Sequence, residues 1–234
     1  MTEKNDSRTA RNNNAQTDNS SAASETRRFT SAKAVYLGHG SLRFDLPDGG
    51  SIYVDPFSGS DEDYTRPADL ILRTHDHFDH TAFSRIKKQN PGCRTITEKE
   101  ALSGGEYKTF DLGFVKAEAV AAGNNKNHDI KKCVGYVLTF PDGGTVYISG
   151  DTSKTAQMEE LGRRGLDYAF FCCDGVYNMG PEEASECAAI VKAGHSIPYH
   201  MLPAKPGNDF NRRTAEKFKN ERRLILAPGE GFDI

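Results

Sequence analysis

Three histidines and two aspartates lie within seven consecutive positions, Thr74 to His80, directly after an apolar run. Imidazole nitrogens and carboxylate oxygens are ligands of zinc, and also of iron, manganese and nickel. Alternate residues of an extended segment point to the same side, so His75, His77 and Asp79 face one way and His80 faces another. One short loop is therefore able to serve two metal ions.

Three further candidate ligands lie in loops elsewhere in the chain. His128 ends a polar loop between two strand-like runs, and His200 directly follows the strand-like residues 197–199. Asp151 follows another strand-like run, after a glycine that permits a tight turn. The alternative for Asp151 is an N-cap of the helix expected at 154–161. Loops at strand ends are places where a rigid scaffold presents functional side chains.

Short strands and helices must position these residues. Glycine-rich turns at 48–50 and 141–144 predict β-hairpins. The alternation of strands with helices predicts an α/β or α+β fold with two sheets. The expected strands cover residues 34–37, 42–46, 51–54, 69–73, 133–140, 145–149, 168–172, 196–199 and 224–226, and the expected helices cover 80–89, 97–102, 154–161, 181–193 and 209–219.

The composition predicts one folded domain behind a polar tail. The 234 residues are enough for one sizeable core. Residues 1–30 are dominated by polar and charged side chains and have too few apolar ones to offset the cost of ordering, so we expect a disordered tail. The tail has no apolar core of a secretory signal. The folded domain is expected at residues 31–234.

Several classes of protein are disfavoured by composition. The formal net charge is only -3, so we expect no nucleic-acid partner held by bulk electrostatics. No apolar stretch approaches the roughly 20 residues that span a bilayer, so we expect no membrane partner. The five cysteines are odd in number and lack paired CxxC spacing, which indicates no disulfide framework. We therefore expect a cytoplasmic protein, and leave open whether it is a homo-oligomer.

The order of the motifs resembles that of the metallo-β-lactamase-fold hydrolases. The matching residues are Asp55, the 74–80 segment, His128, Asp151 and His200, and the resemblance covers roughly residues 32–229. It implies a four-layer αββα sandwich in which two sheets pack face to face under outer helices, with a metal site at one edge. The segments 37–41, 54–57 and 178–184 are similar to those of the L-ascorbate-6-phosphate lactonase-like branch.

The resemblance also implies two divalent metal ions, with Zn2+ as the first choice and Mn2+, Ni2+ or Fe2+ as alternatives. One would be held by His75, His77 and His128, the second by Asp79, His80 and His200, with Asp151 between them. Two such cations hold and activate a bridging hydroxide. Asp79 and Asp151 are the expected catalytic carboxylates, with Asp79 orienting the hydroxide and carrying a proton. Asp55 is expected to bind the second ring nitrogen of a metal-ligating histidine and so fix the direction of that ring. His39 is expected to line the site.

The expected function is hydrolysis of a small ester, lactone or phosphoester, with a small-molecule substrate. One alternative is an iron-dependent redox enzyme of the same fold. In diiron oxygen-reducing relatives a glutamate replaces the second histidine of the motif, so His77 disfavours that version. The other alternative is a nucleic-acid phosphodiesterase. Such relatives carry an RNA-grasping arm or an inserted domain, for which this chain has no room.

Overall fold

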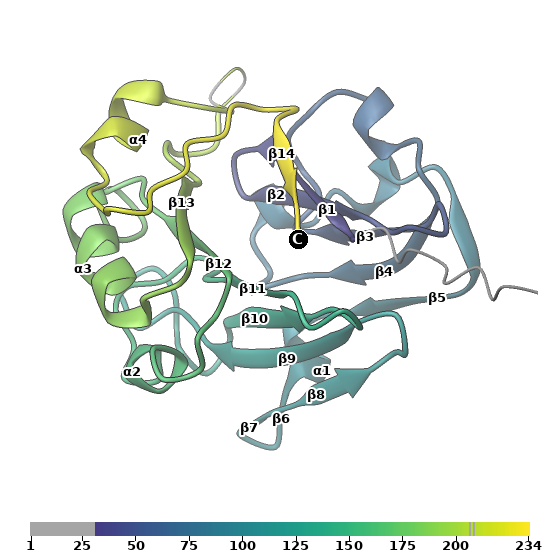
Figure 1. Ribbon diagram of the computed structural model, residues 1–234, viewed down its shortest axis with the longest axis horizontal. Helices are drawn as coiled ribbons and strands as arrows, with labels where there is room; N and C mark the ends of the chain where they lie inside the picture. Colours follow the sequence, from purple (N-terminus) through teal and green to yellow (C-terminus); the bar gives the residue numbers. More distant parts are fainter. Residues whose placement is uncertain (1–30, 206, 208) are drawn as a thin grey trace, which may run out of the picture.

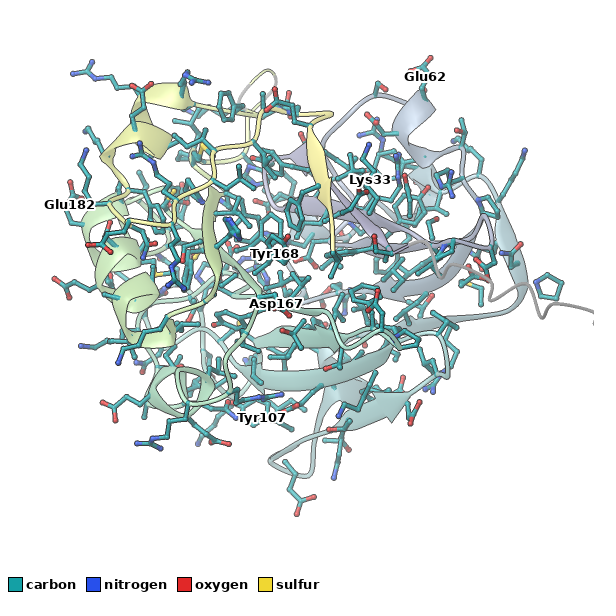
Figure 2. All side chains as sticks on the ribbon, in the orientation of Figure 1. Lys33, Glu62, Tyr107, Asp167, Tyr168 and Glu182 are labelled. Atoms are coloured by element: carbon teal, nitrogen blue, oxygen red, sulfur yellow. The ribbon has the colours of Figure 1, made fainter. Side chains whose placement is uncertain are left out.

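The structure is a computed structural model that describes residues 31–205, 207 and 209–234. The expected disordered tail, residues 1–30, lies outside the described residues. Two six-stranded sheets pack against each other through one continuous core, to which both contribute buried side chains (Figure 1). Figure 2 shows side chains filling the space between the sheets and charged residues such as Glu62 and Glu182 at the surface. The two-sheet sandwich expected from the sequence is confirmed.

The two sheets have the same plan. Three neighbouring strands at one end of each sheet are parallel, and the remaining pairs are antiparallel. The first sheet has the order β14 (Gly231–Asp233), β1 (Lys33–Gly38), β2 (Ser41–Asp45), β3 (Ser51–Val54), β4 (Ala68–Leu72) and β5 (Gln89–Ile96). The second has the order β13 (His195–Tyr199), β12 (Tyr168–Cys172), β11 (Thr145–Ile148), β10 (Val134–Thr139), β9 (Lys116–Ala121) and β8 (Thr109–Asp111). A small hairpin pairs β6 (Leu102–Ser103) with β7 (Glu106–Tyr107).

The outer layers of the sandwich differ. The helices are α1 (Glu98–Ala101), α2 (Met158–Leu161), α3 (Pro181–Val191) and α4 (Arg212–Lys217). Helix α3 packs on β12 and β13 of the second sheet, flanked by α2 and α4 (Figure 1). The far face of the first sheet is covered instead by a separate apolar cluster that includes Tyr53, Tyr64, Ile71 and Ile86. Two short 3₁₀ turns contribute to this cover: η1 (Glu62–Tyr64) through Tyr64 and η3 (Phe83–Arg85) through Phe83. A third such turn, η2 (Phe78–His80), lies between β4 and η3.

Two sequence-based expectations about elements are wrong. The helix expected at 80–89 is replaced by the two turns η2 and η3, and β5 already begins at Gln89. The backbone N–H of Ala82 donates to the carbonyl of Pro56 instead of joining a helical ladder. The strand expected at 224–226 is also absent: next to β13, only a single bridge forms between Ser196 and Arg223. For residues 80–89, bonds to distant segments override the local helix propensity.

Among the described residues, no helix is long and apolar enough to cross a membrane.

Candidate metal centre

The sequence-predicted residues follow the carboxyl ends of strands. His39 follows β1, Asp55 follows β3, the segment 75–80 follows β4, Asp151 follows β11 and His200 directly follows β13. Carboxyl ends of parallel strands lie at the same edge of a sheet, where ligands bind in open α/β sheets. Because the two sheets pack face to face, the loops of both meet at this edge. The β9–β10 connection adds His128.

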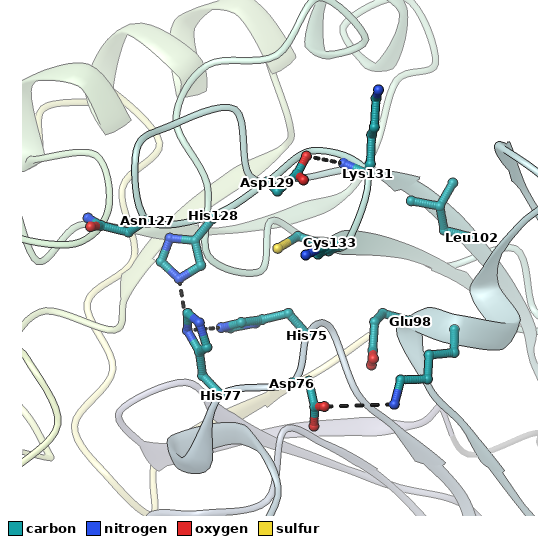
Figure 3. A pocket seen from close by; sticks show the side chains of 12 residues that line it. His75, Asp76, His77, Glu98, Leu102, Asn127, His128, Asp129, Lys131 and Cys133 are labelled. Atoms are coloured by element: carbon teal, nitrogen blue, oxygen red, sulfur yellow. Dashed lines mark hydrogen bonds and ion pairs between the residues drawn. The ribbon is translucent and has the colours of Figure 1, made fainter.

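Three histidines form the first group. His77 Nδ1 lies 3.0 Å from His75 Nε2 and 3.2 Å from His128 Nε2, as the dashed lines in Figure 3 show. The ligand atoms of all three lie within 4.8 Å of one another. His75 and His128 are buried, whereas His77 is exposed to the cavity. This is a geometry in which three nitrogens are able to hold one cation.

The second group combines a carboxylate with histidines. His80 Nε2 lies 3.9 Å from Asp79 Oδ1, and His200 Nε2 lies 3.9 Å from Asp79 Oδ2. His39 joins this group, because its Nε2 lies 3.0 Å from Asp79 Oδ2 and its ring centroid lies 3.8 Å from that of His200. The side chains of this group could also hold a metal ion.

Asp151 lies between the two groups. Its Oδ2 lies 3.4 Å from His128 Nε2 of the first group and 3.3 Å from His200 Nε2 of the second. Its Oδ1 lies 3.6 Å from His80 Nε2. The structure thus brings together all seven residues expected as ligands, with Asp151 in the position of a bridge. Their roles as metal ligands stay predictions.

The charges of the cluster test whether divalent cations fit it. Asp55, Asp79 and Asp151 are all buried. Within the described part of the chain, no lysine or arginine lies within ion-pair distance of any of them, and only histidine rings do. Neither Asp151 Oδ1 nor His80 Nε2 has a hydrogen-bond partner there. Buried charges are normally paired or bound to metals, so the donor set fits divalent cations.

The pKa values of the buried groups of the cluster are shifted in both directions. Burial alone would raise the pKa of Asp151, but His200 and His80 outweigh it and hold this pKa well below its usual range. Burial lowers the pKa of His75 well below that of an ordinary histidine, and the nearby His80 adds to the effect. Burial would lower the pKa of His80, but Asp151 and Asp55 outweigh it and raise this pKa well above that of an ordinary histidine. Asp151 and His75 thus already have the forms that bind a divalent metal, whereas His80 would release a proton on binding one.

Asp55 holds two of the histidines in place. Its Oδ2 lies 2.9 Å from His80 Nδ1 and accepts a 2.6 Å hydrogen bond from Thr74 Oγ1. Thr74 Oγ1 in turn lies 3.0 Å from His75 Nδ1. Groups of this kind fix the tautomer and direction of a ligating histidine. The sequence predicts this role for Asp55 but not for Thr74, although Thr74 directly precedes the histidine motif.

Two polar loop residues with a similar position were also missed. Asn125 Oδ1 accepts hydrogen bonds from the backbone N–H groups of Asn127 and His128, and it lies 3.3 Å from His128 Nδ1. Asp174 Oδ2 lies 3.7 Å from His200 Nδ1. The available sequence signal was position alone: Asn125 lies three residues before His128, and Asp174 lies two residues after the end of β12.

The backbone at three of these residues is unusual. His39, Asp55 and His200 have φ values of 49°, 47° and 46°, a left-handed region that non-glycine residues seldom adopt. Such residues persist where the surroundings over-determine them, commonly at functional sites. Gly150, before Asp151, has a φ of 62° and approaches the Val134 carbonyl so closely that a Cβ would lie 2.8 Å from its oxygen. Only glycine fits there, which confirms the tight turn expected before Asp151.

Asn178 supports Asp151 through a contact that the sequence did not predict. Its Nδ2 donates a 2.8 Å hydrogen bond to Asp151 Oδ2, and its side chain is buried. This bond fixes the rotation of the carboxylate and directs the other oxygen, Oδ1, towards His80.

Replacing Asn178 with alanine is therefore expected to weaken metal binding about 10- to 100-fold, the usual effect of removing a group that orients a ligand. Competition against a chromophoric chelator measures the apparent Kd. The matched control is Asn90→Ala, which removes the same kind of bond, from Asn90 Nδ2 to Asp69 Oδ1, away from the cluster. Equal metal affinity in wild type and Asn178→Ala would show that Asn178 does not orient Asp151 for metal binding.

Two cavities adjoin the cluster and share His77 and His128 in their walls. The larger, of about 620 Å³, extends from His75 towards Glu98, Leu102 and Cys133 (Figure 3). The smaller, of about 390 Å³, is also lined by Asp79, Asp151 and His200. The smaller cavity therefore gives a small molecule access to both groups.

Comparison with known proteins decides the family. The family model described as the Beta-lactamase superfamily domain matches residues 33–200, most of the chain. The chain belongs to the metallo-β-lactamase superfamily. It is also similar to proteins named UPF0173 metal-dependent hydrolase, one from Ligilactobacillus salivarius (30% identity, 80% of this chain and 94% of that one) and one from Pyrococcus furiosus (27% identity, 86% and 99%). This metallo-β-lactamase superfamily member thus falls within a family of metal-dependent hydrolases.

A solved structure agrees with this assignment. The crystal structure of a protein from Parabacteroides distasonis, assigned as a metal-dependent hydrolase, matches with a TM-score of 0.67 and 27% identity, over 83% of this chain and 91% of that one. The metallo-β-lactamase fold expected from the sequence is confirmed. The relatives' names give neither a substrate nor the number of metal ions.

Proposed function

We propose that this protein hydrolyses a small ester, lactone or phosphoester with two bound divalent cations, Zn2+ being the first choice. The observation that carries the proposal is the set of three buried carboxylates, Asp55, Asp79 and Asp151, surrounded by histidines and unpaired with any described lysine or arginine. In the proposal His75, His77 and His128 hold one cation, Asp79, His80 and His200 hold the other, and Asp151 contacts both.

When bound, the cations would supply an activated hydroxide and polarise the substrate's oxygen. The chain's own part is to fix the donors and to move a proton. His39 Nε2 lies 3.0 Å from Asp79 Oδ2 and leaves Oδ1 free of that contact. Burial would raise the pKa of Asp79, but the hydrogen bond with His39 and the charge of His80 hold it well below its usual range. The carboxylate is therefore ionised at neutral pH, which is the form that would hold a cation and orient the attacking hydroxide.

Chelation is expected to abolish turnover. The full chain loaded with zinc should contain close to two metal ions, measured by elemental analysis, and should hydrolyse a member of a panel of esters, lactones and phosphodiesters. Removal of the metal should lower the rate at least about a hundredfold, since several kcal/mol of transition-state stabilisation is lost. Adding zinc back should restore it. Full turnover by metal-free protein would contradict the proposal.

The same preparation tests the metal and the alternative chemistry. Reconstitution with Mn2+, Ni2+ or Fe2+ ranks the alternatives by rate. A redox enzyme would instead require iron, show a visible absorption band and consume an oxidant. The exposed His77 supports hydrolysis, because a histidine stands where the diiron oxygen-reducing relatives have a glutamate.

The lactonase-like branch and the compartment stay predictions. Similarity in segments 37–41 and 54–57 supports the L-ascorbate-6-phosphate lactonase-like branch, while the relatives described above carry a family name without a substrate. A cytoplasmic location is supported by the five cysteines, all of which are free. Cytoplasmic reductants keep such thiols reduced.

A further inference from the structure

Exposed apolar side chains gather at the smaller cavity. Four large apolar residues are exposed within the described part of the chain: Phe78 (70%), Val176 (54%), Tyr177 (52%) and Ile130 (36%). Phe78 and Tyr177 both line the cavity of about 390 Å³ that also contains Asp79, Asp151 and His200. Phe78 comes from the loop after β4 of the first sheet, and Tyr177 from the loop after β12 of the second. An exposed apolar patch next to a polar cluster commonly marks a ligand-binding surface.

Both aromatic residues are held by their surroundings. The Phe78 ring packs edge-on against Phe57, with centroids 5.8 Å apart. The Tyr177 backbone carbonyl accepts a 3.0 Å hydrogen bond from Asn127 Nδ2. Asp174 Oδ1 accepts bonds from the backbone N–H groups of residues 176, 177 and 178 at 2.7, 2.9 and 3.0 Å. The Phe78 ring and the backbone of the loop that carries Tyr177 are thus positioned before any ligand arrives, which lowers the entropic cost of binding.

Outside the proposed metal ligands, the smaller cavity has few groups that recognise a phosphate. Its Lys205 is the single cationic side chain there, and it is opposed by Asp76. Phosphate recognition normally uses several basic groups or a helix N-terminus. The neighbouring larger cavity contains lysines but as many carboxylates. Its Lys99 lies 3.8 Å from Asp76, and Figure 3 shows Lys131 directed away from the histidines.

We propose that the substrate is a carboxylic ester or lactone bearing an apolar alkyl or aryl group, which lies between Phe78 and Tyr177. Its reacting carbonyl then lies over the cluster of Asp79, Asp151 and His200. This inference rests on the proposed hydrolytic function and narrows it, since it selects apolar acyl compounds over sugar phosphates. Water adds to the carbonyl carbon, the bond from that carbon to the alkoxy oxygen breaks, and a proton passes to the leaving oxygen.

Binding of product acids tests the apolar contact without turnover. The zinc-loaded full chain is titrated with acetate, butyrate, hexanoate and octanoate by calorimetry. Affinity is expected to rise about two- to fourfold per added methylene, the range for partial to full burial of that group. Phe78→Ala and Tyr177→Ala should flatten this dependence, and Phe78→Leu should keep most of it. Metal content is measured for each variant, so that loss of zinc is recognised.

Val176→Ala is the matched control, because Val176 is equally exposed in the same loop but does not line the cavity. It should leave the chain-length dependence unchanged. Equal affinity for all four acids, or tighter binding of inorganic phosphate than of octanoate, overturns the inference. The inference is also overturned if size-exclusion chromatography shows that the wild type is an oligomer and that Phe78→Ala dissociates it. The aromatic pair would then form an interface between copies of the chain.

Kinetics with p-nitrophenyl acetate, butyrate and octanoate separates this inference from the proposed function. The expected result is a kcat/KM that rises with chain length in wild type and Val176→Ala and becomes flat in Tyr177→Ala. Hydrolysis that is independent of chain length overturns the inference and leaves the hydrolytic function standing. The opposite result is that the acids bind with an affinity that depends on chain length but no ester is hydrolysed. That result overturns the proposal that the protein hydrolyses esters and leaves the apolar binding site standing.

Discussion

Replacing Asp151 with asparagine is expected to lower kcat/KM by at least about a thousandfold, equivalent to several kcal/mol of lost metal-assisted stabilisation. Asp151 is within 4 Å of histidine nitrogens from both groups, and no other carboxylate of the described residues is, so it would contribute to both proposed cation positions. Asparagine keeps the size of the side chain but removes the negative charge. The affinity of the cluster for two divalent cations should therefore fall with the rate.

Elemental analysis and steady-state kinetics of Asp151→Asn measure both effects. The control is Asp142→Asn, which makes the same chemical change in the exposed hairpin turn between β10 and β11 and should leave metal content and rate unchanged. Thermal unfolding of the metal-free forms checks that the variant folds. A variant that binds two zinc ions and turns over at the wild-type rate would show that Asp151 does not bridge the cations.

The second large effect is expected for Asp79→Asn, with a fall in kcat of about 10²- to 10⁴-fold, the usual contribution of a positioned acid or base. The hydrogen bond with His39 and the charge of His80 outweigh burial and keep the pKa of Asp79 low. The wild-type residue is thus an ionised acceptor, whereas an amide takes no proton at neutral pH.

The readout for Asp79→Asn must separate proton transfer from metal loss. Single-turnover rates are therefore compared at saturating zinc, where the occupancy of the second position is restored. A rate that recovers fully at high zinc would mean that Asp79 acts only as a ligand. A rate that stays low with both metals bound supports the proton-carrying role.

The sequence was informative about the donors because most of them lie in loops after apolar strands and because their order resembles that of the metallo-β-lactamase-fold hydrolases. Residues 51–54 and 168–172 are buried strands of the sandwich. Asp55 directly follows the first of them, and the loop that contains Asn178 follows the second. The supporting contacts were not predictable in the same way. The bond from Asn178 to Asp151 joins residues 27 positions apart, and its existence depends on how β11 and β12 pair.

The edges of the sheets were harder to predict than their centres. Strand β5 reads QNPGCRTI and is mostly exposed, so it has no apolar signal, and β14 is a three-residue strand. Both exist because a neighbouring strand offers its backbone N–H and C=O groups. The expected helix at 80–89 failed for a related reason, since the backbone of this segment is bonded to distant loops such as that of Pro56.

The placement of the proposed ligands on loops of both sheets has a consequence for the protein in the cell. A cation held by His75 and His77 on one side and His128 on the other would add a link between two halves of the sandwich. These halves already meet through packing and through a few hydrogen bonds, such as that from the Val134 N–H to the Thr74 carbonyl. The binding energy of the cation would then count towards folding. Chains made under metal shortage would unfold more often and be removed by proteases, so cellular abundance would follow the supply of metal.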